Sequence, residues 1–185
     1  DSVNARKLFQ TYHGKVPFVK QLSYALSDFA TDEGLLFTLG DRFCRFNKWE
    51  TNDKKWNNDK QRFDEVPLYN NKEQAMDAYK LEQMKKYKEL TDPECEFFDK
   101  HYTRAFTYKA LNRLIQGSAA DMTKKAMVDL YEKGVIPHIQ IHDELCFSTT
   151  DHESKMIKET MEQTIPLEVK NKVDYESGPN WGAIK

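Results

Sequence analysis

Two adjacent carboxylates, Asp143 and Glu144, are the side chains best suited to chemistry in this sequence. Ile139 and Ile141 before them alternate with polar residues, which is the period of a half-buried β-strand, and a short apolar run, 145–147, follows. The pattern predicts a tight hairpin with both carboxylates at its turn. No Lys or Arg adjoins them, so they are suited to holding a hard cation such as Mg²⁺, as metal-assisted phosphoryl chemistry requires.

Each of these residues also has an ordinary structural explanation. Asp143 is a turn-favouring residue type, and Glu144 points away from its neighbour unless the turn brings the two together. His142 is either a site residue or a satisfied strand histidine. His138 and His142 do not share one metal ion, because four strand residues span about 13 Å.

Asn112 and Gln116 are four residues apart in a predicted helix, so they stack on one face. Their amides can donate and accept hydrogen bonds together, as the minor-groove edges of base pairs require. Gly117 and the pair 119–120 leave the surface near Gln116 without bulk, which favours a large ligand such as a duplex end. The flanks carry Lys109, Arg113 and Thr123, and the opposite, apolar stripe consists of Leu111, Leu114, Ile115, Ala119, Met122 and Ala126.

The charge of the whole chain argues against a protein whose entire surface binds nucleic acid. Its 185 residues have a net charge of −2 and a pI near 6.3. The region from 104 to 125 is different, because it holds five basic residues and one acid, Asp121. This local excess is what contact with a DNA backbone requires. The basic residues are Arg104, Lys109, Arg113, Lys124 and Lys125.

Composition sets the class of protein. A hydrophobic content of 39% against 31% charged residues is typical of a soluble protein, and no apolar run approaches the ~20 residues of a membrane helix. The start lacks a basic-then-apolar leader, so we expect no secretion, and the absence of Met at position 1 suggests a processed product or fragment. Three widely spaced cysteines favour neither a disulfide framework nor zinc, which indicates a reducing, cytoplasmic location.

The remaining elements are expected from local signals. A helix to about Tyr12 should be followed by one opening at Pro17, and a hairpin should place 35–39 against 42–46. Trp49 and Trp56 lie in a predicted loop, and 71–90 forms an exposed amphipathic helix. Further on, Thr150 and Glu153 make a capping box for a helix ending near 164, and Leu167, Val169, Val173 and Tyr175 suggest strands that pair with the Asp143 hairpin.

In order and spacing, the chain resembles the C-terminal palm of family A DNA polymerases, of the DNA polymerase I and phage type. The resemblance is carried by the helix with Asn112 and Gln116-Gly-Ser-Ala-Ala-Asp121, then by His142-Asp-Glu144, then by Ser177-Gly-Pro-Asn-Trp181. It is strong from 104 to 147, moderate from 153 onward and weak from 5 to 46. Where bacterial members carry an Arg one turn before Asn112, this chain has Tyr108.

The resemblance implies an α+β fold, in which an antiparallel palm sheet with a catalytic hairpin is flanked by helices within a larger right-hand polymerase. Residues 1–46 would be the helices and hairpin after the fingers. Residues 47–100 would be a partly helical insertion, touching DNA or another subunit or simply solvated. Residues 101–185 would be the palm, with the DNA-contacting helix, the hairpin and the C-terminal tail.

The implied function is nucleotidyl transfer from dNTP to a primer 3′-hydroxyl by two-metal catalysis. Asp143, Glu144 and His142 would be catalytic. Asp143 and Glu144 would bind Mg²⁺, with a second aspartate outside this chain. The residues that would contact primer–template DNA are Asn112, Gln116, Arg113, Lys109 and Arg104.

The chain matches neither the family's upstream aspartate motif nor its fingers helix. We therefore expect a partner, the fingers, thumb and upstream palm, in the same chain or as a separate one, and little activity alone. Two other classes remain open, a non-catalytic DNA-binding scaffold with a palm fold and a metal-dependent nuclease.

Overall fold

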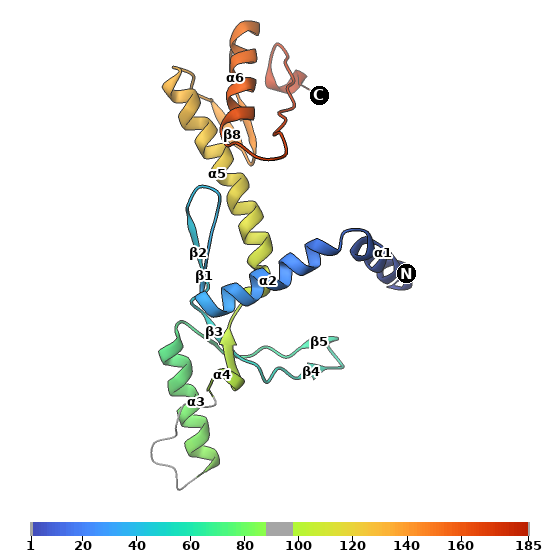
Figure 1. The fold of residues 1–185 in the computed structure, drawn as a ribbon, viewed down its shortest axis with the longest axis vertical. Helices are drawn as coiled ribbons and strands as arrows, with labels where there is room; N and C mark the ends of the chain where they lie inside the picture. Colours follow the sequence, from blue (N-terminus) through green and yellow to red (C-terminus); the bar gives the residue numbers. More distant parts are fainter. Residues whose placement is uncertain (1, 88–97, 185) are drawn as a thin grey trace. The chain divides into compact units, whose positions relative to one another are not determined.

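The computed structural model describes residues 2–87 and 98–184 (Figure 1). The chain divides into two compact units, one of Asp1–Phe37 with Phe43–Leu114, and one of Thr38–Arg42 with Ile115–Lys185. Both mix helices with strands, and every strand pair in the described residues is antiparallel. The chain is therefore α+β, as the sequence predicts. No helix in the described ranges combines the length and apolar character needed to cross a membrane.

The first unit begins with two helices, α1 (Ser2–Lys15) and α2 (Pro17–Glu33). Pro17 starts α2 because its fixed φ suits the first helical turn. Gly34 ends α2 with a φ of 74°, and its N–H donates to the carbonyl of Ala30 at 3.1 Å. β1 (Leu35–Phe37) then pairs with β2 (Phe43–Arg45), with Leu36 opposite Cys44. The predicted pair of helices and the hairpin after them are confirmed.

A three-stranded sheet follows in the first unit, with strand order β6–β3–β7. Its strands are β3 (Trp49–Thr51), β6 (Leu68–Tyr69) and β7 (Tyr102–Arg104), and a separate hairpin consists of β4 (Trp56–Asn57) and β5 (Arg62–Phe63). The prediction that Trp49 and Trp56 lie in a loop is wrong, because both are in strands. The polar residues around them hid two short strands, of which β3 has partners distant in sequence and β4 pairs with the nearby β5.

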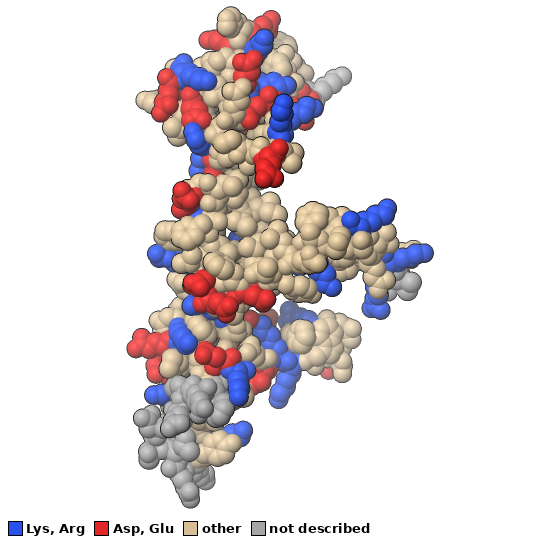
Figure 2. All heavy atoms as spheres, in the orientation of Figure 1, with Lys and Arg blue, Asp and Glu red and all other residues tan. Residues whose placement is uncertain are grey.

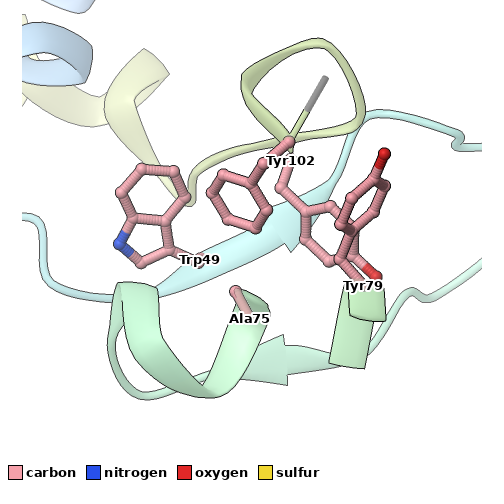
Figure 3. Close-up of a cluster of buried hydrophobic side chains, with 5 residues drawn as sticks. Trp49, Ala75, Tyr79 and Tyr102 are labelled. Atoms are coloured by element: carbon pink, nitrogen blue, oxygen red, sulfur yellow. The ribbon is translucent and has the colours of Figure 1, made fainter. Parts of the chain in front are cut away.

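Helix α3 (Lys72–Lys86) covers this sheet and helps to form a small aromatic core. Figure 3 shows Trp49, Ala75, Tyr79 and Tyr102 side by side; Phe98, from α4 (Phe98–His101), stacks on Tyr102 with ring centroids 5.1 Å apart. The helix predicted over 71–90 exists, although its last three residues lie outside the described ranges. It is not simply solvated, because Ala75 and Tyr79 are buried.

The long helix α5 (Ala110–Glu132) follows a 3-10 turn, η2 (Thr107–Lys109), and passes from the first unit into the second. In the second unit, β8 (Ile139–Ile141) pairs with β9 (Glu144–Cys146). Helix α6 (Asp151–Gln163) begins at the predicted capping box, where Thr150 and Glu153 bond to each other's backbone N–H, and a 3-10 turn, η3 (Trp181–Ala183), lies near the end.

The predicted strands between Leu167 and Tyr175 do not form in the described part of the tail. The β8–β9 sheet has only its own two strands. Val169 is 81% exposed, and the N–H of Val173 donates to Glu162 of α6 at 3.0 Å. Apolar alternation alone does not make a strand, because a strand also needs a partner edge for its backbone groups.

Candidate functional site

The β8–β9 hairpin has a two-residue turn made of His142 and Asp143. Ile141 lies opposite Glu144, so Glu144 is the first residue of β9 and not part of the turn as the sequence suggested. His142 has a φ of 53°, a left-handed conformation that costs most L-residues about 1–2 kcal/mol. The left-handed backbone of His142 closes the turn and sets Asp143 at the tip of the hairpin.

All three candidate catalytic side chains, His142, Asp143 and Glu144, are exposed. The carbonyl of His142 accepts a hydrogen bond from Gln140 Nε2 at 3.2 Å, and Glu144 Oε1 accepts a weak one from Cys146 Sγ at 3.9 Å. The carboxylate of Asp143 has no hydrogen bond or ion pair with any other described residue. It is free to bind a cation or a ligand from outside the chain.

The hairpin offers two carboxylates to a cation. Carboxylate oxygens are the ligands that Mg²⁺ prefers, and Asp143 and Glu144 provide them on consecutive residues. Across the described ranges, no three His, Cys, Asp or Glu side chains converge on one point. The residues present therefore suit a divalent cation only if further ligands come from elsewhere.

The two amide side chains of α5, Asn112 and Gln116, are exposed. Neither forms a hydrogen bond with another described residue, so the alternative that they bond to neighbouring loops does not hold in this structure. Ala119 and Ala120 are also exposed and continue the strip past Gln116 with little bulk. These amides are available to an external ligand.

The predicted apolar stripe of α5 is partly wrong. Ile115 is 59% exposed and Ala119 is exposed, whereas Ala126 is buried as expected. Thr123, expected on a flank, is 8% exposed. Polar residues of α5 such as Thr123 are buried in place of the predicted apolar ones, because the helix packs partly through hydrogen bonds.

The candidate phosphate-binding cations are unequal. Arg104 is half-buried: its guanidinium donates to the carbonyls of Thr31 and Phe46 at 3.0 and 3.2 Å and lies over the Trp49 ring. Arg113 donates to the carbonyl of Arg45 at 3.3 Å. Lys109 is exposed, and within the described ranges its ammonium group lies over two aromatic rings, those of Phe106 and Tyr108.

Figure 2 shows acidic and basic side chains interspersed within each unit on the visible face, without one continuous basic surface. This agrees with the net charge of −2. Any contact with a DNA backbone therefore depends on a few local cations rather than on the field of the whole chain.

Sequence reasoning missed the group that holds turn 38–42 on α5. Asp121 accepts hydrogen bonds from the N–H of Gly40 at 3.0 Å and from Arg42 Nε. Ser118 Oγ accepts from the N–H of Leu39 at 3.1 Å, and Arg42 Nη2 donates to the carbonyl of Gly117 at 2.9 Å. We call this set of contacts the turn clamp.

Two glycines allow the close approach in the turn clamp. A Cβ on Gly117 would lie 2.6 Å from Thr38 Cγ2, and a Cβ on Gly40 would lie 2.8 Å from Asp121 Cγ. The expectation that Gly117 leaves room for a ligand is therefore wrong, because Thr38 occupies that space. The useful signal in the sequence was Asp121 itself, the one acid among the basic residues of this region.

The turn clamp also sets the ionisation of Asp121, whose side chain is 5% exposed. Burial by itself raises the pKa of this carboxyl. Hydrogen bonds from Arg42 and the Gly40 N–H, together with the charge of Arg42, outweigh burial and lower the pKa below its ordinary value. Asp121 is thus a buried, stabilised anion.

Known proteins support the same assignment. The family model of DNA polymerase family A matches residues 1–183. The DNA-directed DNA polymerase of Pseudomonas phage M6 is 35% identical over 95% of this chain and 19% of its own length. DNA polymerase I of Bacillus subtilis is 45% identical over 39% of this chain and 9% of its own length, and the thermostable DNA polymerase I of Thermus aquaticus is 34% identical over 50% and 12%.

The phage match extends over residues that the bacterial matches leave out. The chain spans about a fifth or less of the length of these relatives. The family model, by contrast, includes nearly every residue of this chain. With the fold and the α5 and hairpin motifs, this match shows that the chain belongs to DNA polymerase family A.

Proposed function

We propose that this chain is the C-terminal palm part of a template-directed DNA polymerase, which transfers a nucleotide from dNTP to a primer 3′-hydroxyl. The observation that carries the proposal is the free carboxylate of Asp143. It stands at the tip of a two-residue hairpin in a family A chain and has no partner among the described residues. The rest of the polymerase, with fingers, thumb and upstream palm, would come from the same or a separate polypeptide.

Asp143 would hold Mg²⁺ in this function, with Glu144 as the second candidate ligand. Bound Mg²⁺ neutralises charge that develops on phosphoryl oxygens during transfer. The chain supplies these two carboxylates on the hairpin, and a further aspartate would be contributed from outside it. His142, directly before Asp143, would lie beside the primer terminus.

Asn112 and Gln116 would contact the minor groove of the primer–template duplex. Their exposed amides can meet the acceptors that lie at nearly the same place in every Watson–Crick pair, so they would test the shape of a pair and not its sequence. Lys109 is the strongest candidate for a phosphate contact, because no carbonyl or carboxylate engages its ammonium group in the described residues. Arg113 and Arg104 would contribute with the donors that their carbonyl partners leave free.

The test is Asp143→Asn in a complete polymerase that carries this chain. We expect primer extension to fall about a thousandfold or more, because a metal contributes several kcal/mol to the barrier. Affinity for the duplex should stay within about twofold, since the substitution keeps the shape of an exposed side chain. Asp174→Asn, whose parent side chain is 92% exposed, is the matched control.

The same assay separates the competing functions. Undiminished extension by Asp143→Asn would remove Asp143 from the metal site. DNA binding without extension in the parent protein would indicate a scaffold, and loss of intact DNA in the absence of dNTP would indicate a nuclease.

A further inference from the structure

We propose that Asp121, acting with Arg42, is a positioning group of the polymerase: the turn clamp fixes α5 so that it presents Gln116 to the primer terminus. This inference rests on the proposed function. Asp121 itself would not contact the substrate. Its effect passes through Gln116, which lies next to a clamped residue.

The geometry of α5 supports this role. Consecutive residues of an α-helix are about 100° apart around its axis, since one turn takes 3.6 residues. Gly117, Ser118 and Asp121 form the face that turn 38–42 covers, while Gln116, Ala119 and Ala120 are exposed beside it. Rotation of α5 about its axis would break the turn clamp and would at the same time displace the amide of Gln116.

The turn clamp has few contacts, but two of its groups, Asp121 and Arg42, are charged. Asp121 is a buried anion that accepts from a backbone N–H and a guanidinium, and hydrogen bonds to charged groups are the stronger kind. Arg42 bridges Asp121 and the carbonyl of Gly117, so one side chain joins two points on the helix. This carbonyl belongs to the residue directly after Gln116.

The clamp also encloses the backbone at Gly117. Thr38 is β-branched and its hydroxyl donates to the carbonyl of Arg42 at 3.1 Å, so its Cγ2 cannot easily turn away from the helix. Gly117→Ala would set a methyl group 2.6 Å from that Cγ2. Thr38→Ser removes Cγ2 and keeps the hydroxyl.

The experiment compares Asp121→Asn, Gly117→Ala and Gly117→Ala/Thr38→Ser in a complete polymerase that carries this chain. For the first two variants we expect the KM for matched primer–template to rise about tenfold, and extension of mispaired termini to rise relative to matched ones. The kcat at saturating primer–template should stay within about twofold. The double variant should recover the parent KM, and Val128→Ala, at an exposed position of α5, is the control.

A double-mutant cycle with Gln116→Ala tests whether Asp121 acts through the amide. If it does, Gln116→Ala/Asp121→Asn resembles Gln116→Ala alone. If Gln116→Ala changes the kinetics and Asp121→Asn changes only the melting temperature, the clamp is merely structural and the inference is wrong. If Gln116→Ala itself has no effect on DNA, the proposed contact fails, which is a separate outcome.

Discussion

At the scale of single residues, Gln116 and Asp143 share one property. The side chain of each is exposed and has no hydrogen-bonding partner among the described residues. Asp121 is the opposite case, because Gly40 and Arg42 of turn 38–42 satisfy its carboxylate. An exposed polar side chain without a protein partner is hydrated and available to a ligand, whereas the buried carboxylate of Asp121 is satisfied within the fold. This contrast separates the proposed DNA contact and metal ligand from the group that positions them.

At the residue scale we predict the effect of Gln116→Ala in a complete polymerase that carries this chain. Loss of the amide should weaken binding of a matched primer terminus about tenfold, as loss of one good base-edge contact does. The melting temperature should hardly change, because the side chain has no protein partner to lose. Duplex binding and melting curves measure the two effects, and a large fall in melting temperature with normal binding would show a structural role instead.

At the scale of elements, the second unit depends on polar joints as well as on apolar packing. Turn 38–42 meets α5 through Asp121 and Ser118, and Thr164 at the end of α6 donates to Asp129 of α5 at 2.6 Å. Lys133 donates to Thr160 at 2.7 Å and adds to the contact between α5 and α6. Buried polar contacts of this kind give a helix one preferred orientation, because rotation leaves a donor or acceptor unpaired.

The ionisation of Asp121 makes the stability of this element depend on pH. Its pKa is lower in the folded chain than in the unfolded one, so its contribution is fully present above the unfolded value of about 4 and is lost as the pH falls through the folded value. We expect Asp121→Asn to lower the free energy of unfolding by about 1–3 kcal/mol at neutral pH. The difference from the parent should shrink below about pH 4.

Thermal melting of both proteins from pH 7 downward measures this difference. Among the described residues, Arg42 is the cation that forms an ion pair with Asp121. A difference that stays constant down to pH 2.5 would contradict the role of the Asp121 anion.

At the scale of the whole molecule, the chain covers a minor share of the length of its relatives. It spans 19% of the phage relative, and its described residues assemble no complete metal site. The first unit holds a three-stranded sheet with its own aromatic core. We propose that the activity belongs to a longer polymerase of which this chain is one part.

We predict that residues 1–185 alone bind primer–template weakly and extend it at a rate no higher than an Asp143→Asn control. Adding the remaining polymerase part, in one polypeptide or as a second chain, should restore extension. A primer-extension assay with each part and with both measures this. Full activity of residues 1–185 alone would show that no outside aspartate is needed.

Local signals in the sequence were enough for much of this protein. Pro17 opens α2, Thr150 with Glu153 starts α6, and the apolar alternation at 139–141 predicted β8. Each of these signals acts within a few residues, so the sequence carries them whatever the rest of the chain does. The order of the α5 motif and His142-Asp-Glu144 also sufficed to indicate the family, which the family match then confirmed.

Tertiary structure alone decided the roles of Trp49, Gly117 and Asp121. Trp49 is buried because Tyr79, Phe98 and Tyr102, remote in the sequence, close over it. Gly117 and Asp121 meet a turn nearly 80 residues earlier, which leaves no periodic mark on the helix. Periodicity records which side of an element is covered by apolar groups, but it does not record which distant segment supplies a hydrogen bond or fills the space of a missing Cβ.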